Sequence, residues 1–442
     1  MKHTGLTLRA TFTVLSCVWL AQLLGNISFA QTMDPDRAAR IREQMGAKNT
    51  RMVNEADLIS LRGEINKAME AVTSRIVALE TEMADTKARI RVLEARTTPT
   101  NSVNNTPVSN ARPARNRDKM QVSMCETGCD ASKFADAVAM LKEGGTLTVK
   151  PGVYFDCIAI KKSIKLIGEI APDGSRAHLK RLACKGKAAI IVGARDVEIH
   201  GLKISEISVP SLNGACIRVA DMANTLLIRN IVCLDSENGI LGGANNLDGV
   251  ITIENSTFEG HGKNGKAHGI YINGGAKAIL RNVNILAADD GHLLKTGARE
   301  TLVEGSVLAA LEGGSGAAIN AYGGGKLTVR NSVLQLGPNT QNHNFLAYAD
   351  EPQRAVSGGV HEILIEKNWI IYDDAARCCR WLFSDRTNIF GTISVRNNNF
   401  VGHITPKIAR IDMTQNKEFA DRAAAGLPEY NGTLASMPKP GG

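Results

Sequence analysis

The chain has 442 residues, of which 43% are hydrophobic, 4% aromatic and 22% charged, with a formal net charge of +8. This length exceeds one ordinary compact core, so we expect several parts or an extended fold. No run of basic residues is long enough for a nucleic-acid-binding arm, which argues against nucleic acid and leaves a polyanionic partner open.

Residues 1–30 have the pattern of a secretory signal peptide. Lys2 and Arg9 precede an apolar run, residues 11–24, which is too short to span a membrane comfortably. Small residues at Ser28 and Ala30 then predict cleavage before Gln31. The expected product has no integral membrane segment and is periplasmic or secreted from a bacterial cell. An uncleaved membrane anchor is the alternative.

A coiled-coil helix is predicted within the next part, residues 31–96. Apolar residues recur with heptad spacing over residues 58–93, at Leu58, Ile65, Val72, Leu79 and Leu93, with Met69, Ile76, Met83 and Ile90 four positions after their partners. So narrow a seam needs a partner, which predicts a homo-oligomer; a single helix folding back on the main domain is the alternative. Residues 97–119, rich in Pro, Asn, Ser and Thr, are expected to form a flexible linker.

Residues 120–410 show an internal repeat that predicts an all-β solenoid. Short β-rich segments recur 23 to 36 positions apart, each ending in a residue suited to a left-handed turn, namely Gly201, Asn230, Asn255, Asn282, Gly305, Asn331, Lys367 and Asn397. Most of these asparagines are therefore expected to be structural. Residues 131–142 are predicted to form an amphipathic helix that caps the first coil. Residues 411–442 are left as a C-terminal tail.

Eight cysteines remain after signal cleavage, which predicts disulfides in an oxidising compartment: Cys125, Cys129, Cys157, Cys184, Cys216, Cys233, Cys378 and Cys379. Residues about one coil apart, such as Cys157 and Cys184, are positioned to stack. The alternative is a thiolate metal site, for which Cys125 and Cys129 alone have remotely suitable spacing.

Several motifs carry a resemblance to a known group of proteins. Residues 145–168 contain a Pro-Gly-x-Tyr turn before an alternating Ile and Lys strand, and further matches occur at residues 213–218, 268–271 and 291–295. Together they resemble exported bacterial right-handed parallel β-helix proteins of the pectate-lyase-like superfamily over about residues 130–402. The resemblance implies a right-handed parallel β-helix. The superfamily includes lyases, epimerases, hydrolases and non-catalytic proteins, so the resemblance does not select one activity.

One segment resembles the catalytic coil of lyases of this fold, where the pattern is Gly-His-x-x-Lys-Ser-Arg-Ala. Here His292 and Lys295 match, Thr296 replaces Ser, and Gly297 replaces Arg, with Arg299 two positions further on. A family Asp in the next coil corresponds to Asn320. The matches imply lyase chemistry, whereas the departures favour a protein without full activity.

Aligning residues 269–274, 292–297 and 318–323 brings the candidate side chains to one strip across three coils. Elimination from a uronic acid needs a group that neutralises the carboxylate, a base, and an acid for the leaving oxygen. The candidates for catalysis are Lys295, His292, Tyr271 and His268, and those for substrate binding are Asn273, Asn320, Tyr322, Arg299 and Glu351. Leu293 and Leu294 break the strand period, so the direction of the Lys295 side chain stays open.

No cofactor is assigned with certainty. Asp289 and Asp290 could hold Ca²⁺, or could form a solvated turn. Glu237 has the same ambiguity between a functional and a structural role. With 4% aromatic residues, the chain lacks a long stacking platform for neutral sugars, which favours charged polymers.

The sequence therefore predicts an exported protein that acts on an acidic polysaccharide as a lyase or a C5-epimerase. A non-catalytic carbohydrate-binding, extracellular-matrix or envelope protein is the first alternative. A glycoside hydrolase is the second, and it would require a pair of outward carboxylates.

Overall fold

The computed structural model describes residues 118–220, 224–242, 248–262, 266–342, 344–351, 361–374, 380–384, 391–408 and 411–441. The signal peptide and the coiled coil predicted for residues 58–93 lie outside these residues, as do Cys378 and Cys379. No helix within the described ranges is long and apolar enough to cross a membrane.

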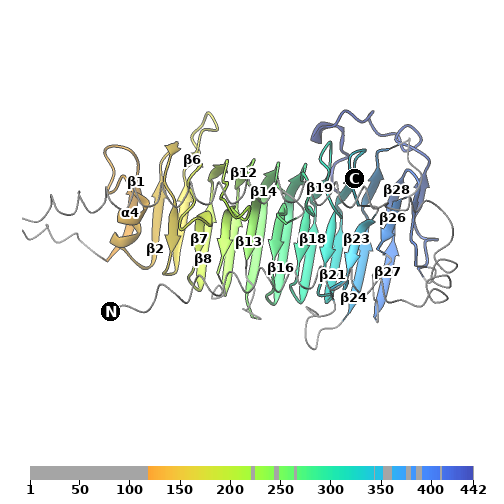
Figure 1. Cartoon of the computed structure of the whole chain (residues 1–442), viewed down its shortest axis with the longest axis horizontal. Coiled ribbons are helices and arrows are strands. Elements are labelled where there is room, and N and C mark those ends of the chain that lie inside the picture. Colours follow the sequence, from red (N-terminus) through yellow and green to blue (C-terminus); the bar gives the residue numbers. More distant parts are fainter. Residues whose placement is uncertain are drawn as a thin grey trace, which may run out of the picture. The chain divides into compact units, whose positions relative to one another are not determined.

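The described residues form a parallel β-solenoid, which confirms the predicted β-helix (Figure 1). Its named strands pair in parallel, coil upon coil, and a ten-stranded sheet counts about ten coils. The right-handed sense of the coil stays a prediction. Three faces run along the stack, and we name them in the order in which the chain enters them.

The first face contains β1 (Lys119–Met124), β2 (Leu141–Val149), β5 (Ile164–Gly168), β8 (Asp196–His200), β11 (Thr225–Arg229), the first halves of β14 (Val250–Glu259) and β16 (Lys277–Leu286), β18 (Glu300–Glu304), β21 (Lys326–Arg330), β24 (Glu362–Glu366) and β27 (Thr392–Arg396). The second face contains β3 (Gly152–Tyr154), β6 (Ala177–Lys180), β9 (Lys203–Ser205), β12 (Val232–Leu234), the second halves of β14 and β16, β19 (Val307–Ala309), β22 (Val333–Leu336), β25 (Trp369–Tyr372), β28 (Asn399–Val401) and β30 (Lys417–Phe419).

The third face is the ten-stranded sheet, and it is the one that carries the candidate site. Its strands are β4 (Ile158–Ile160), β7 (Ala188–Val192), β10 (Ala215–Val219), β13 (Asn238–Gly242), β15 (Ile270–Ile272), β17 (Leu294–Thr296), β20 (Ile319–Ala321), β23 (Asn344–Tyr348), β26 (Arg380–Phe383) and β29 (Ile404–Thr405).

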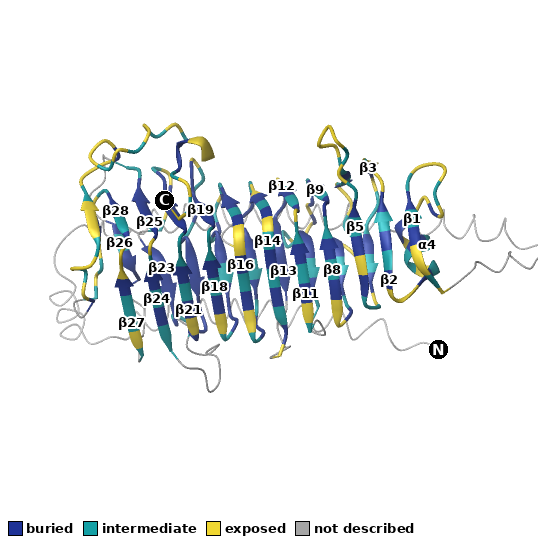
Figure 2. Ribbon diagram, turned by 180° about the vertical axis from the view of Figure 1, so that it is seen from behind, coloured by how far each residue is buried: buried dark blue, intermediate teal, exposed yellow. Residues whose placement is uncertain are grey.

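Alternation along each strand of the first face creates the core, as the bands of buried and exposed residues in Figure 2 show. In β18, Thr301 and Val303 point inward and are almost completely buried, whereas Glu300 and Glu304 point outward. Because the coils stack in register, the inward residues form continuous apolar columns.

The eight residues predicted to end the repeated segments all occupy the left-handed region, with φ between 49° and 71°. Each turns the chain from the first face to the second. Asparagine and glycine tolerate this conformation better than other residues. Their regular recurrence in the sequence therefore marks the position of this turn in each coil.

A row of buried Ser and Asn side chains follows these turns from coil to coil. Their oxygens accept hydrogen bonds from backbone N–H groups that lie in the turn and therefore do not pair with a neighbouring strand. Ser306 Oγ accepts the Val283 N–H at 3.0 Å, and Ser332 Oγ accepts the Ser306 N–H at 3.1 Å. Asn368 and then Asn398 continue the pattern with their side-chain oxygens. The predicted structural role of asparagines in the turns thus extends into the core.

The helix α4 (Phe134–Met140) caps the first coil, as predicted for residues 131–142 (Figure 1). It is shorter than expected, because β2 begins at Leu141 and pairs with β1. Phe134 is fully buried and packs at 5.9 Å, centroid to centroid, from the Tyr154 ring.

The C-terminal residues fold back over the second face near β19 and β25 (Figure 1). Met437, next to the short 3-10 helix η2 (Leu434–Ser436), packs into the same apolar cluster as Val307 and Val333. Arg422 forms ion-paired hydrogen bonds of 2.5 and 2.8 Å to Asp373, and both side chains are largely buried. This segment, residues 417–437, covers the C-terminal half of the second face.

Within the described residues, three disulfides join Cys125 to Cys129, Cys157 to Cys184, and Cys216 to Cys233. The prediction of disulfides, and of stacking between Cys157 and Cys184, is therefore confirmed. The thiolate metal site considered for Cys125 and Cys129 is wrong, because these two sulfurs are bonded to each other. Three disulfides indicate a protein that folds outside the cytoplasm.

Removing the Cys157–Cys184 bridge should destabilise the N-terminal coils. The bridge closes 27 positions of sequence, for which the chain-entropy model gives about 3 to 4 kcal/mol. We expect the double variant Cys157→Ser/Cys184→Ser to unfold at a clearly lower denaturant concentration. Far-UV circular dichroism during denaturation measures this, and an unchanged midpoint would show that the bridge stabilises nothing.

Candidate functional site

Three candidate side chains share one outward column on the third face. The Cα of Lys295 pairs with Tyr271 on one side and with Asn320 on the other, along β15, β17 and β20. Lys295 therefore points outward, which answers the question that Leu293 and Leu294 left open.

The sequence alignment was wrong by one residue in the middle coil, where it set Leu294 opposite Tyr271. The reason is that Leu293 is buried just before β17 begins, so Leu294 is the inward residue of the strand. Two consecutive leucines can both be buried only because they stand on either side of a corner.

Lys295 is held in a partly buried ion pair with Glu351. Its Nζ lies 2.7 Å from Glu351 Oε1, and the two side chains are 13% and 24% exposed. The same Nζ lies 5.3 Å from the ring centroids of both Tyr271 and Tyr322, within the range of cation–π attraction. The ammonium group is thus positioned by one carboxylate and two aromatic rings.

His268 and His292 stack beside this group. Their ring centroids are 5.3 Å apart with an interplanar angle of 11°, and the His268 ring meets Tyr271 edge-on at 5.1 Å. His268 Nδ1 accepts the backbone N–H of His292 at 3.1 Å, and His292 Nδ1 accepts the N–H of Ala317 at 3.0 Å. Each ring therefore carries its proton on Nε2 in its neutral form.

Burial and the neighbouring positive charges keep both imidazoles neutral. Burial lowers the pKa of His268 to about 2, with His292 and Lys295 adding to the effect. Burial, and then Lys295, lowers the pKa of His292 to about 4. At neutral pH both imidazoles are therefore uncharged and add no positive charge beside Lys295.

Stability should fall in mild acid because of these buried imidazoles. An unfolded histidine has a pKa of about 6.5. His268, His292 and the fully buried His261, whose pKa burial lowers to about 4, bind protons only when the chain unfolds. Their stabilising contribution is complete above pH 6.5 and is lost as the pH falls from 6.5 towards 4, on the order of 1 to 2 kcal/mol each.

Denaturant titrations at pH 7 and pH 5 measure this loss, and the variant His268→Asn/His292→Asn should show a smaller difference between the two pH values. Equal midpoints at both pH values in the parent protein would contradict the burial argument.

Asn320 is buried and completes the histidine pair. Its side-chain amide lies 3.2 Å from His292 Nε2. The Asn320 atom at that distance is Nδ2, and because Nε2 carries the ring proton, the amide must be turned by 180° for its oxygen to accept the hydrogen bond. Asn320 is therefore packed against His292 and is not exposed on the third face.

The Tyr322 side chain lies against Gly297, the position at which the lyase pattern has an arginine. It is 1% exposed, and its hydroxyl donates to the backbone oxygen of Asn273 at 2.5 Å. A Cβ on Gly297 would overlap the Tyr322 hydroxyl and would lie 2.7 Å from Asn273 O. Because Gly297 has no side chain, the tyrosine from the next coil has room to pack against it.

Thr296 points into the core and is not a site residue. Its hydroxyl lies 3.0 Å from the Thr301 hydroxyl and accepts the Ala298 N–H at 3.2 Å. Replacing the Ser of the lyase pattern by Thr therefore changes the packing of a turn and leaves the outer surface of the third face unchanged.

The remaining candidates lie outside the Lys295 contacts given above. Arg299 lies in the turn before β18, 3.4 Å from Asp248. Within the described residues, no third His, Cys, Asp or Glu joins Asp289 and Asp290 as a metal site.

Glu237 is structural. It is fully buried and accepts hydrogen bonds from the Gly214 N–H at 2.5 Å, the Ser208 hydroxyl at 2.9 Å and the Val209 N–H at 3.3 Å.

Two residues of the same outward column escaped the sequence reasoning. Arg218 pairs with Leu241, and Leu241 pairs with Tyr271, so the column continues from Lys295 towards the N-terminal end of the stack. Leu241 and Tyr271 belong to a small apolar cluster with Ile191. Residues 213–218, which contain Arg218, are one of the motifs that carry the resemblance, but only the strand register reveals that Arg218 and Lys295 share a column.

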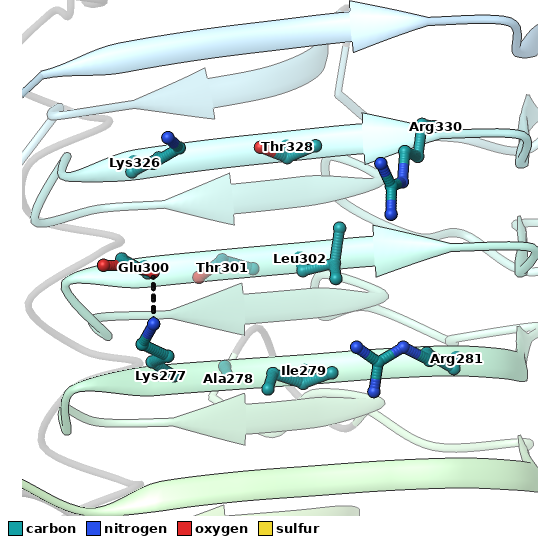
Figure 3. A pocket seen from close by; sticks show the side chains of 10 residues that line it. All are labelled: Lys277, Ala278, Ile279, Arg281, Glu300, Thr301, Leu302, Lys326, Thr328 and Arg330. Carbon is teal, nitrogen blue, oxygen red and sulfur yellow. Dashed lines mark ion pairs between the residues drawn. The ribbon is translucent and has the colours of Figure 1, made fainter.

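A hollow of ≈ 330 Å³ lies on the first face (Figure 3). Its wall includes Lys277, Glu300 and Lys326 along one side and Arg281 and Arg330 along the other. Because acidic and basic strands alternate there, this hollow offers no uniformly positive track for a polyanion.

Comparison with known proteins finds solved structures with a similar fold. No protein-family model matches the sequence, and no curated protein matches it significantly. A crystal structure of pectate lyase Pel9A is similar with a TM-score of 0.46 and 14% identity, covering 73% of this chain and 86% of the lyase.

A pectin methylesterase mutant in complex with hexasaccharide IV is similar with a TM-score of 0.30 and 11% identity, covering 72% of this chain and 98% of the esterase. A Geobacillus virus E2 protein, ORF18, is similar with a TM-score of 0.33 and 16% identity over 65% of this chain and 55% of its own. The chain is thus a β-solenoid that resembles pectate lyase and pectin methylesterase structures in fold.

Proposed function

We propose that this exported protein binds an acidic polysaccharide along the third face and acts on it by proton transfer at C5 of a uronic acid, as a lyase or an epimerase. The observation that carries the proposal is the outward ammonium of Lys295, partly buried above the rings of Tyr271 and Tyr322. A partly desolvated cation in an aromatic setting suits the carboxylate of a sugar.

The residues divide the work as follows. Lys295 pairs with the substrate carboxylate or transfers the C5 proton. The ion pair between Lys295 and Glu351 breaks when the polymer binds. Tyr271, in register with Lys295 and exposed in part, is the remaining candidate for protonating the leaving oxygen, because His292 is neutral. His268, His292 and Asn320 form the fixed wall behind these groups, and Arg218 provides a second cation along the polymer.

A non-catalytic carbohydrate-binding protein of the envelope or matrix is the second candidate function. Two observations favour it. Glu351 already compensates the charge of Lys295, and the Tyr322 hydroxyl lies where a side chain at position 297 would begin. A glycoside hydrolase would need a second carboxylate opposite Glu351, and Glu237 is consumed by backbone hydrogen bonds.

Incubation of the mature protein with a panel of uronic-acid polymers separates these functions. A lyase yields an unsaturated product with new ultraviolet absorbance, an epimerase changes the polymer's NMR spectrum without cleavage, and a hydrolase yields reducing ends without the absorbance. Binding to a polymer with none of these products supports the binding module. Neither binding nor turnover across the panel would overturn the proposal.

The cellular setting also belongs to the proposal. Cleavage of the signal peptide would leave a periplasmic or secreted protein, in which the seam of residues 58–93 forms a homo-oligomer. Light scattering on the mature chain tests the oligomer directly.

A further inference from the structure

The outward side of the first face is built from three rows of side chains. The entry row contains Lys277, Glu300, Lys326 and Glu362, and the exit row contains Arg229, Glu254, Arg281, Glu304, Arg330, Glu366 and Arg396. The centre row between them contains Leu227, Thr252, Ile279, Leu302, Thr328 and Leu364. Figure 3 shows members of all three rows on β16 and β21, and Glu300 and Leu302 on β18.

Charge alternates from strand to strand, with the same sign in both rows of one strand. β16 carries Lys277 and Arg281, whereas β18 carries Glu300 and Glu304. β21 is again basic, with Lys326 and Arg330, and β24 is again acidic, with Glu362 and Glu366. A uniformly charged polymer would meet repulsion at every second strand.

Ion pairs within the chain fix these side chains in place. Lys277 lies 3.0 Å from Glu300, Lys326 lies 3.2 Å from Glu362, and Arg330 lies 2.6 Å from Glu304. The members of the first two pairs are still 39% to 49% exposed. These charged side chains are therefore already held in place but still accessible to solvent. A docking partner would lose little side-chain entropy by contacting them.

The arrangement of the three rows resembles that of a protein–protein interface. Leu302, Ile279 and Leu364 form an apolar centre, half-buried within the chain, and charged rows border it on both sides. The six first-face strands from β14 to β27 lie about 4.8 Å apart and are each about five residues of 3.3 Å, which gives on the order of 500 Å² per partner. Two such surfaces together come to about 1,000 Å², the lower limit for a specific interface.

We infer that the first face is a homodimer interface, with a second copy of this chain as its partner. A two-fold axis that runs parallel to the strands, in the plane between the two copies and midway between β18 and β21, brings β18 onto β21 of the second copy and β16 onto β24. Every contact then joins an acidic strand to a basic strand, and β14 with Glu254 meets β27 with Arg396 in the same way. An axis through a strand would instead oppose equal charges, so the pattern selects this register.

The axis between β18 and β21 is favoured because it centres the four strands that carry charge in both rows. It also sets Leu302 of one copy opposite Thr328 of the other. This pair of residues gives a test that is independent of any contact made by residues 58–93.

Mixing full-length Leu302→Cys protein with full-length Thr328→Cys protein should form a mixed disulfide between the two positions, identified by mass spectrometry. We expect it to form at least tenfold faster than a disulfide between Leu302→Cys and Leu182→Cys, because Leu182 is exposed away from the first face. Equal rates would overturn the interface.

Leu302→Arg provides a second measurement that does not depend on cysteine chemistry. The new arginine lies between Glu300 and Glu304 of its own strand, which suits the separate chain, but it faces the basic β21 of the second copy. We expect the dissociation constant of the first-face contact, from light scattering over a concentration series, to rise at least tenfold. Leu182→Arg is the matched control and should leave it unchanged; an unchanged assembly for Leu302→Arg would contradict the inference.

Discussion

Lys295→Ala should reduce turnover of an acidic polysaccharide at least 100-fold while leaving the solenoid folded. General acid–base groups commonly contribute factors of 100 to 10,000, and Lys295 is the one candidate that can both pair with a carboxylate and exchange a proton. The side chain packs outward against two rings and one carboxylate, so its loss opens no cavity in the core. Initial rates and circular dichroism on the same sample measure both parts.

Lys203→Ala is the matched control, because it removes a lysine from the second face at β9. Its turnover should equal that of the parent protein. Lost turnover with retained polymer binding in Lys295→Ala supports catalysis, whereas lost binding in a parent that never turns over supports the binding module. Unfolding of Lys295→Ala would show that the lysine is structural and would remove the site assignment.

Gly297→Arg, which restores the residue of the lyase pattern, should damage this protein instead of activating it. Any Cβ at this position overlaps the hydroxyl of Tyr322, and the backbone oxygen of Asn273 leaves no room on the other side. We expect a loss of about 1 to 3 kcal/mol from overpacking, with function lost as Tyr322 moves away from Lys295. Denaturant unfolding and the polymer assay measure the two effects.

A compensating change makes the argument specific. Tyr322→Ala removes the colliding ring, so Gly297→Arg/Tyr322→Ala should be affected less than the two single changes added together. Thr296→Ser is a control on the same turn, since it keeps the buried hydroxyl that bonds to Ala298. Additive losses in the double variant would show that Tyr322 and position 297 do not compete for space.

The repeat in the sequence predicted the fold because the constraint is local. A left-handed turn recurs in each coil, and only residues such as Gly201 and Asn230 meet it cheaply, so the period can be read from the chain. The stacking of Cys157 on Cys184 follows from the same period. Neither inference requires knowledge of side-chain packing.

The site was harder to predict because its contacts join different coils. Lys295 and Glu351 are 56 positions apart, and the register of β17 depends on whether Leu293 is buried in a corner or in a strand. The neutrality of His268 and His292 arises from burial, which a residue type does not reveal. The close approach of the Tyr322 hydroxyl to Gly297 likewise links two residues that the sequence separates.

Binding of a uronic-acid oligosaccharide, compared with its carboxyl-reduced neutral counterpart, tests the central claim most directly. Both ligands have the same length and linkages and differ only in the charge that Lys295 is proposed to recognise. Isothermal titration of the mature protein should give an affinity at least tenfold higher for the acidic ligand, and Lys295→Ala should abolish the difference. Equal affinities of the parent protein for the two ligands would contradict the account.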